Sequence, residues 1–204
     1  MLKIYVARHG QNEDNANGIL NGHRDMPLTP IGVRQGYELA DGIKKAGITF
    51  DVVYTSPLVR AKRTAEIVCE TLGLDGPQVL PELIERDFGV MTGQPAARIE
   101  ELCAPDIVKA EKVTYFLCPE GAETFPMLID RARRVLADIR DAHADESVLL
   151  STHGDFGKML YAAFYRVAWQ GMLTMFHFGN CELLLLAPDA DPDEPHVVRV
   201  EQYN

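Results

Sequence analysis

The sequence has 204 residues, of which 47% are hydrophobic and 25% charged, and its formal net charge is −10. This length and composition suit a single domain, residues 1–204, with a sizeable core. The negative charge argues against nucleic acid or an anionic membrane as a partner, because binding to phosphate backbones depends on clustered Lys and Arg. The most apolar late run, residues 183–187, is far shorter than the roughly 20 residues of a membrane helix.

The amino terminus and the cysteines give an expectation for the cellular compartment. Only three residues precede the first apolar run, too few for a cleavable signal peptide. The cysteines are scattered, with no C-x-x-C pair and no nearby His at metal-ligand spacing, and they are interpreted as small buried hydrophobic residues in a reducing cytosol: Cys69, Cys103, Cys118 and Cys181. We therefore expect a cytoplasmic protein without disulfides or zinc.

The first predicted element is a buried strand that ends in Arg8, His9 and Gly10. Residues 4–7 are apolar and include β-branched and aromatic side chains, which is typical of a strand inside a sheet. Arg8 and His9 should lie at its carboxyl end, where open α/β sheets bind ligands. The tripeptide alone is also typical of a buried structural histidine beside a surface arginine, so the rest of the chain decides between the two interpretations.

Strands and helices are expected to alternate after this point. Residues 11–28 are rich in Asn, Gly and Asp and predict a loop over the strand end. A helix is expected over residues 30–47, then a strand over 50–54, then a helix that begins with Thr-Ser-Pro at residues 55–57. Arg60 falls in the first turn of that second helix. This alternation predicts a parallel sheet with right-handed crossovers.

The middle of the chain is broken by prolines. An inserted cap segment, about residues 90–122, is expected over the strand ends, with short helices near 95–103 and 105–112. A longer helix is predicted from about residue 123, with Arg131 among the arginines that point largely outward.

A further strand, residues 146–152, is as apolar as the first; like the first it ends in His and Gly, at His153 and Gly154, and it precedes a helix over 156–169. The last apolar segments are predicted as strands, some of them antiparallel: residues 174–177, 182–187 and 197–203. The predicted fold is an α/β three-layer sandwich with a mostly parallel central sheet, helices on both faces and a short inserted cap segment.

Four groups that can carry positive charge should thus meet at one edge of the sheet: Arg8, His9, Arg60 and His153. Holding them together is costly unless an anion is bound, because like charges repel and depress the pKa of each histidine. A phosphoryl group fits, since Arg offers planar bidentate donors and protonated His offers another. Asn15 in the loop can add a neutral donor.

Six motifs follow one another in a fixed order between about residues 4 and 187. They are Arg8-His9-Gly10, Asn15, Leu28-Thr29-x-x-Gly32, Ser56-Pro57-Leu58-x-Arg60-Ala61-x-x-Thr64-Ala65, Glu85-x-x-x-Gly89 and His153-Gly154. Together they resemble the histidine phosphatase superfamily, also called phosphoglycerate mutase-like.

The resemblance implies a role for each matched residue. His9 would be the nucleophile and become a phosphohistidine, while Arg8, Arg60 and His153 would hold the phosphoryl oxygens. Glu85 would be the general acid. Alternatively, Glu85 is a solvated loop residue without a catalytic role; Asp87 is then the nearest substitute as the general acid. The resemblance implies neither a metal nor a cofactor for this chemistry.

Further residues are candidates for substrate binding. Asn180 resembles a family asparagine near the second histidine, and a donor there can orient His153. Gly22 and the Glu85-Arg86 pair resemble the mutase branch. The full set of candidate substrate-binding residues is Asn15, Asn21, Gly22, Arg86 and Asn180.

The leading hypothesis is a metal-independent phosphomonoesterase for a small phosphorylated metabolite. The alternative is a cofactor-dependent phosphoglycerate mutase, which returns the phosphoryl group to substrate. Mutases of this family carry a longer insert with paired arginines, whereas residues 96–119 contain only Arg98. A third hypothesis is a binding module without turnover. The sequence leaves the substrate and the oligomeric state open, a homo-oligomer included.

Overall fold

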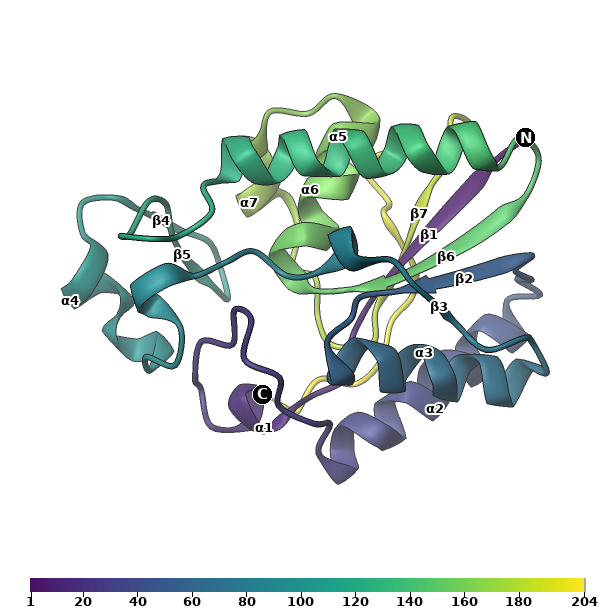
Figure 1. Ribbon diagram of the computed structural model, residues 1–204, viewed down its shortest axis with the longest axis horizontal. Helices are drawn as coiled ribbons and strands as arrows, with labels where there is room; N and C mark the ends of the chain where they lie inside the picture. Colours follow the sequence, from purple (N-terminus) through teal and green to yellow (C-terminus); the bar gives the residue numbers. More distant parts are fainter. Residues whose placement is uncertain (204) are drawn as a thin grey trace.

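The computed structural model describes residues 1–203 as a sheet between two helical layers; Asn204, the last residue of the expected domain, lies outside the described residues. One face is covered by α5 (Phe125–Ala142), α6 (Gly154–Tyr165) and α7 (Trp169–Met175) (Figure 1). The other face carries α2 (Pro30–Lys45) and α3 (Val59–Leu72). The predicted α/β class with helices on both faces is confirmed.

The central sheet has the strand order β3-β2-β6-β1-β7-β8. Its strands are β1 (Lys3–Arg8), β2 (Val52–Thr55), β3 (Gln78–Val79), β6 (Ser147–Thr152), β7 (Leu183–Leu186) and β8 (His196–Val198). The first four run parallel, and β7 and β8 pair antiparallel at one side. The register pairs Arg8 with Thr152 and Thr55 with Ser151, so β1, β2 and β6 end together at one edge.

Alternation along β1 divides the core between the two faces. Ile4 and Val6 belong to the apolar cluster under α5, α6 and α7, whereas Tyr5 and Ala7 pack with α2 and α3. Because successive strand side chains point to opposite faces, one short apolar run contributes to both halves of the core. The backbone at the end of β1 is thereby held from both sides.

The start of α2 packs closely against the chain that leaves β1. Thr29 caps this helix, its hydroxyl accepting from the Gly32 amide, and Pro30 is its first residue. A Cβ at Gly32 would lie 2.0 Å from the Gln11 carbonyl oxygen, and one at Gly10 would lie 2.4 Å from the Gly32 carbonyl oxygen. Only glycine permits this approach of helix and strand end.

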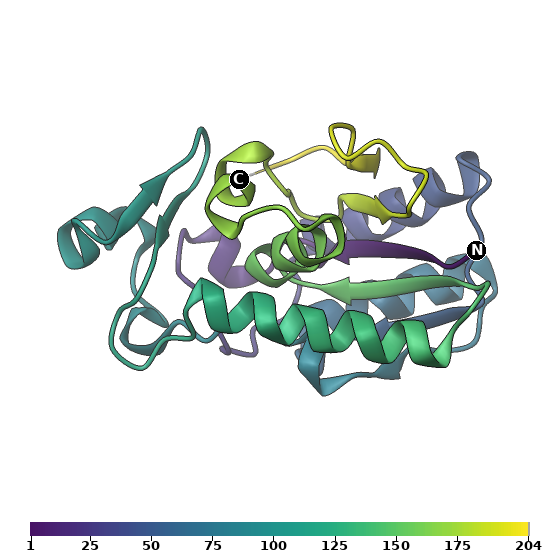
Figure 2. The same cartoon turned by 90° about the horizontal axis from the view of Figure 1, so that it is seen from above.

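The segment between β3 and α5 begins within the body, where Leu83 joins the main core, and from η2 onward it projects beyond the strand ends, as Figure 2 shows most clearly. Its elements are η1 (Pro81–Leu83), η2 (Gly89–Met91), η3 (Ala96–Arg98), α4 (Ile99–Cys103), β4 (Ile107–Lys109) and β5 (Thr114–Phe116). It has a small apolar cluster of its own, made by Phe88, Met91, Ile99 and Phe116. The inserted cap segment thus lies over the edge at which β1 and β6 end. That the chain forms a single domain stays a prediction.

Two of the expected elements are wrong in type. The helix expected over 105–112 is the strand β4, because Ile107 and Val108 pair with β5 to form a hairpin. Of the strand expected over 174–177, the first two residues end α7, in which Met172 and Leu173 are buried at adjacent helical positions, and the last two follow the helix without forming a strand. In both places tertiary packing overrides a weak local preference.

Other elements differ in their bounds. The helix expected to begin at residues 55–57 begins at Val59, because Ser56 turns its hydroxyl to accept the Leu58 amide. The loop over 11–28 contains a short helix, α1 (Glu13–Ala16), which Asn12 caps. The last strand, expected over 197–203, is limited to β8. No helix within residues 1–203 is long and apolar enough to cross a membrane.

Candidate active site

The edge at which β1 and β6 end brings two histidines together. The ring centroids of His9 and His153 lie 5.2 Å apart, and both side chains are buried. The Nε of Arg60 donates to His9 Nε2 at 3.3 Å. Arg8, His9 and Arg60 line one cleft of about 950 Å³. The residues that the sequence placed at the sheet edge therefore meet in a single site.

The tautomer of His9 follows from its hydrogen bonds. Its Nδ1 lies 2.7 Å from the Gly10 carbonyl oxygen, which can only accept, so Nδ1 carries the proton. The lone pair is then on Nε2. The Gly10 amide donates to the Thr64 hydroxyl, which in turn donates to the Arg60 carbonyl, so α3 fixes the backbone beside His9.

Burial and neighbouring cations keep both imidazoles neutral. The pKa of His9 is lowered well below 6.5, first by burial and then by the charges of Arg60 and Arg8. Burial likewise lowers the pKa of His153, with Arg60, His9 and Arg8 adding to the effect. Neutral His9 therefore presents a nucleophilic nitrogen at ordinary pH.

Arg60 is fully buried and held by backbone oxygens. Its Nη1 donates to the Arg24 carbonyl at 2.6 Å and its Nη2 to the Gly22 carbonyl at 3.0 Å. Burial lowers its pKa to about 10, so it stays charged at neutral pH. The loop around Gly22 thus positions a cation beside His9.

Two polar atoms at the site have no hydrogen-bond partner among residues 1–203. Arg8 donates through Nη1 to the Phe178 carbonyl at 2.6 Å, but its buried Nε has no acceptor. His153 is held through Nε2 by the Ser56 hydroxyl at 2.7 Å, and its buried Nδ1 is unpartnered. The Ser56 oxygen already accepts from the Leu58 amide, so its hydroxyl donates to His153 Nε2 and the ring proton is on Nδ1. Because an unpaired buried donor is costly, an oxyanion that reaches both groups would satisfy them.

Glu85 lies at the amino terminus of α6. Its Oε1 accepts from the amides of Arg86 at 2.8 Å and Phe156 at 3.1 Å, and its Oε2 accepts from the Asp155 amide at 3.3 Å. Burial, and then the nearby charge of Asp155, raise its pKa above the usual 4.5, while the hydrogen bonds from the Arg86 and Phe156 amides, and then Arg60, act in the opposite direction. This environment favours a carboxyl group that holds its proton to higher pH than a solvated glutamate does.

Arg131 was expected to point largely outward, and this is wrong. It is buried, pairs with Glu123 at 2.7 Å, and donates to the Glu82 and Ile84 carbonyls at 2.6 and 2.7 Å. It also donates to the Glu85 carbonyl at 3.3 Å. Arg131 therefore anchors the segment that carries Glu85, which helical periodicity alone did not indicate.

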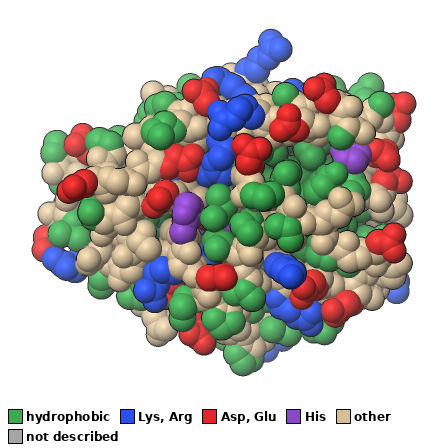
Figure 3. Space-filling model, viewed as in Figure 1, with side chains coloured by type: hydrophobic (Ala, Val, Ile, Leu, Met, Phe, Trp, Pro, Cys, Tyr) green, Lys and Arg blue, Asp and Glu red, His purple; other side chains and the backbone are tan. Residues whose placement is uncertain are grey.

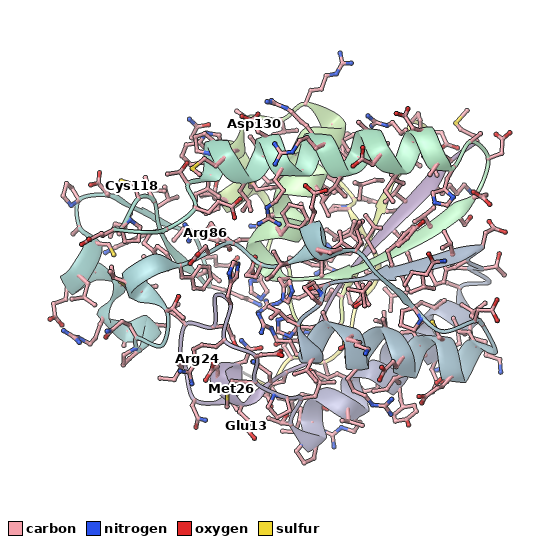
Figure 4. All side chains as sticks on the ribbon, in the orientation of Figure 1. Glu13, Arg24, Met26, Arg86, Cys118 and Asp130 are labelled. Carbon is pink, nitrogen blue, oxygen red and sulfur yellow. The ribbon has the colours of Figure 1, made fainter. Side chains whose placement is uncertain are left out.

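Arg86 lies between the cap and the α/β body, as its label in Figure 4 shows. It lines the cleft, yet its Nε pairs with Asp155 at 2.8 Å. Its guanidinium also packs on the rings of Phe116 at 4.3 Å and Phe125 at 4.4 Å. The charge of Arg86 is thus already balanced, and its contacts tie the cap to α5 and α6.

Of the remaining candidates, two line the cleft and two hold the backbone or side chain of His9 and Arg60. Asn15 and Asn21 line the cleft, and Asn21 accepts a hydrogen bond from Asn12 at 2.5 Å. Asn180 donates to the His9 carbonyl at 2.9 Å and to Asn15 Oδ1 at 3.3 Å. Gly22 contacts Arg60 through its carbonyl. Asn180 and Gly22 thus act on His9 and Arg60 directly.

The sequence motifs did not indicate two residues that position other side chains of the site. Ser56 was expected only as part of the Thr-Ser-Pro start of a helix, whereas its hydroxyl contacts His153. Asp155 forms an ion pair with Arg86 and lies near Glu85; its position directly after His153-Gly154 in the sequence could have indicated this role.

Within residues 1–203 there is no group of three or more His, Cys, Asp or Glu that could hold a metal ion. Figure 3 shows acidic and basic side chains interspersed over one face of the molecule.

Comparison with known proteins agrees with the motifs. A family model described as histidine phosphatase superfamily (branch 1) matches residues 4–202. The chain is 30% identical over 179 residues to a 2,3-bisphosphoglycerate-dependent phosphoglycerate mutase of Parvibaculum lavamentivorans, covering 84% of each protein. It is 33% identical over 154 residues to the uncharacterized phosphatase PhoE of Bacillus subtilis, covering 76% of this chain and 72% of that protein.

The fold has a close match among solved structures. A mycobacterial glucosyl-3-phosphoglycerate phosphatase in complex with VO3 superposes with a TM-score of 0.77 at 24% identity, covering 91% of this chain and 92% of that chain. Taken with the match over residues 4–202, the chain belongs to the histidine phosphatase superfamily, and the predicted family and enzyme class are confirmed. The relatives include phosphatases and mutases, so membership alone does not distinguish hydrolysis from return of the phosphoryl group.

Proposed function

We propose that this protein is a metal-independent phosphomonoesterase that hydrolyses a small phosphorylated metabolite through a phosphohistidine at His9. The observation that carries the proposal is the neutral His9 ring. Its Nε2 accepts from Arg60 Nε at 3.3 Å, Arg8 and Arg60 line the same cleft as His9, and the ring centroid of His153 lies 5.2 Å away. Phosphoryl transfer depends mainly on positioning and on stabilising negative charge, and fixed buried cations supply both.

In the first half-reaction, His9 Nε2 attacks phosphorus and the bond to the leaving oxygen breaks. Arg8, Arg60 and the Nδ1–H of His153 donate to the non-bridging oxygens. Glu85 gives its proton to the leaving oxygen, which departs as an alcohol. Its raised pKa keeps that proton available.

In the second half-reaction, water replaces the departed alcohol beside Glu85. The carboxylate takes a proton from this water, whose oxygen attacks the phosphorus of phosphohistidine. The phosphorus–nitrogen bond breaks, and His9 returns to its neutral form as inorganic phosphate leaves. Asn180, bonded to the His9 carbonyl at 2.9 Å, holds the backbone of the nucleophile in place.

The second candidate is a phosphoglycerate mutase, which the relative in Parvibaculum lavamentivorans favours. The arginine content of the cap argues against a mutase. Arg98, its arginine within 96–119, bonds Glu101 at 2.8 Å and Gln94 at 3.2 Å and is not among the residues that line the cleft. A paired-arginine site for a substrate carboxylate is therefore absent from the cap as far as the described residues show it.

The experiment measures where the phosphoryl group goes. Purified protein is given p-nitrophenyl phosphate with a chelator present, and 3-phosphoglycerate with and without 2,3-bisphosphoglycerate. The proposal expects release of inorganic phosphate that the chelator does not suppress. Interconversion of 3- and 2-phosphoglycerate that depends on the bisphosphate and exceeds phosphate release would favour the mutase. Saturable binding of the esters with no turnover would favour a binding module.

A further inference from the structure

The proposed mechanism leaves one buried lysine in the cleft unused. Lys158 lies in the second turn of α6, lines the cleft, and is 2% exposed. Its Nζ donates to the Tyr115 hydroxyl at 3.1 Å and to the Leu173 carbonyl at 2.9 Å. These partners use two of the three N–H donors of an ammonium group. Lys158 is held in place without taking part in binding the phosphoryl group.

No carboxylate within residues 1–203 forms an ion pair with Lys158. The closest acidic influence is Asp155, which is already paired with Arg86 at 2.8 Å. Burial lowers the pKa of Lys158 to about 8, with Asp155 opposing and Arg8 adding to the effect. A buried cation without a counter-charge is costly, and a ligand anion would offset that cost.

Tyr115 adds a second donor at the same place. It comes from β5 of the cap, is 6% exposed, and lines the cleft beside Lys158. Burial raises the pKa of its phenol, so the hydroxyl keeps its proton and can donate while it accepts from Lys158. An ammonium and a hydroxyl held in contact form a donor pair suited to one carboxylate or phosphate group.

The same wall carries further positive charge. Lys112, between β4 and β5, is exposed and lines the cleft. His177 also lines the cleft. Its pKa is lowered to about 4, first by burial and then by Arg8, while Glu182 opposes the shift and Lys112 and Lys158 add to it, so His177 is uncharged at neutral pH. In a chain of net charge −10, this wall is locally cationic.

We propose that Lys158 and Tyr115 form a second anion subsite, so that the preferred substrate is a phosphomonoester bearing a further carboxylate or phosphate group. This inference rests on the proposed function, because it presumes that the phosphoryl group occupies the pocket of His9. The subsite is made by α6 and the cap hairpin rather than by paired arginines. It assigns substrate selection to residues that have no part in the transfer step.

The test compares matched esters on the wild-type protein. 3-Phosphoglycerate is paired with glycerol 3-phosphate, which has a hydroxymethyl group in place of the carboxylate. Fructose 1,6-bisphosphate is paired with fructose 6-phosphate, which lacks the second phosphate. p-Nitrophenyl phosphate reports on the phosphoryl pocket alone. A charged hydrogen-bonded contact predicts a kcat/KM at least about 10-fold higher for the doubly anionic member of one pair. Which pair responds identifies the anion as carboxylate or phosphate.

Variants then locate the effect. Lys158→Met should lower kcat/KM for the preferred ester by about 10- to 100-fold, mainly through KM, and leave p-nitrophenyl phosphate within about 2-fold. Tyr115→Phe keeps the ring and should give a smaller loss of the same kind. Lys112→Gln should reduce kcat/KM for the same ester, whereas Lys109→Gln on the same hairpin, paired with Glu100 outside the cleft, should not.

The outcomes separate this inference from the proposed function. If wild-type protein hydrolyses p-nitrophenyl phosphate but treats both members of each pair alike, the subsite is overturned and the proposed function stands. If no ester is hydrolysed, the proposed function itself fails. Should Lys158→Met fail to fold, Tyr115→Phe and the wild-type ratios decide: a preference that Tyr115→Phe leaves unchanged contradicts the subsite.

Discussion

The two walls of the cleft are built in different ways. At the sheet edge, the polar side chains are held by backbone or hydroxyl partners: buried Arg60 by two carbonyls, and the buried, neutral His153 by Ser56. On the cap, the charged side chains are largely exposed and pair with near neighbours, as Arg98 does with Glu101. The difference indicates that the chemistry is fixed by the core, whereas the cap can change with substrate at small cost to stability.

The largest effect should follow from removing the nucleophile. His9→Ala should lower kcat for p-nitrophenyl phosphate by on the order of 10⁴-fold or more, because no other neutral nitrogen occupies its place. His143→Ala is the matched control, since His143 contacts Tyr54 and Glu146 and does not line the cleft. Substantial activity in a folded His9→Ala protein would break the assignment.

Arg60→Ala should have the next largest effect. It removes a cation beside His9 and two hydrogen bonds that hold the loop at Gly22. Loss of one preorganised donor predicts a fall in kcat of about 10²- to 10³-fold. Arg60→Lys should recover only part of this, because an ammonium lacks the planar fork. Equal activity of the two variants would contradict a positioned guanidinium.

Glu85→Gln should lower kcat most for substrates with poor leaving groups. With an alkyl phosphate, kcat should fall by about 10²- to 10³-fold, and with p-nitrophenyl phosphate much less, because that leaving group departs without a proton. Asp87→Asn is the control for the alternative acid; Asp87 caps the Gly89 amide and should tolerate the change. The reverse ranking of the two variants would move the role to Asp87.

The pH profile should be bell-shaped, with limbs set by two groups. Activity should fall as pH drops through the lowered pKa of His9, below 6.5, because protonation removes the lone pair. It should fall again as pH rises through the raised pKa of Glu85, because the acid loses its proton. Glu85→Gln should abolish the second limb and keep the first.

The smallest effect is expected on the cap. Arg98→Gln breaks an exposed pair with Glu101 and should leave both the thermal midpoint and the hydrolysis of p-nitrophenyl phosphate unchanged within error. A large loss of activity would mean that Arg98 reaches the substrate, as a mutase would require, and would remove the contrast between the two walls.

The elements that could be predicted from sequence are those with strong local signals. The apolar runs of β1 and β6 end in histidine and glycine, and parallel pairing then brings His9 and His153 to one edge. The hairpin of β4 and β5 could not be predicted, since prolines obscure its pattern and its strands have three residues each. Long-range partners were also missed: Arg131 lies on a helix whose periodicity is compatible with a solvated arginine, yet it binds carbonyls far away in the sequence.

The most direct test of the account is to trap the phosphoenzyme. The protein is mixed with excess substrate, quenched in alkali where phosphohistidine survives, digested, and examined by mass spectrometry. The account predicts one phosphoryl group on the peptide that contains His9, attached at Nε2 and absent from the His9→Ala variant. A phosphoryl group on His153, or turnover with no phosphohistidine at any time, would contradict it.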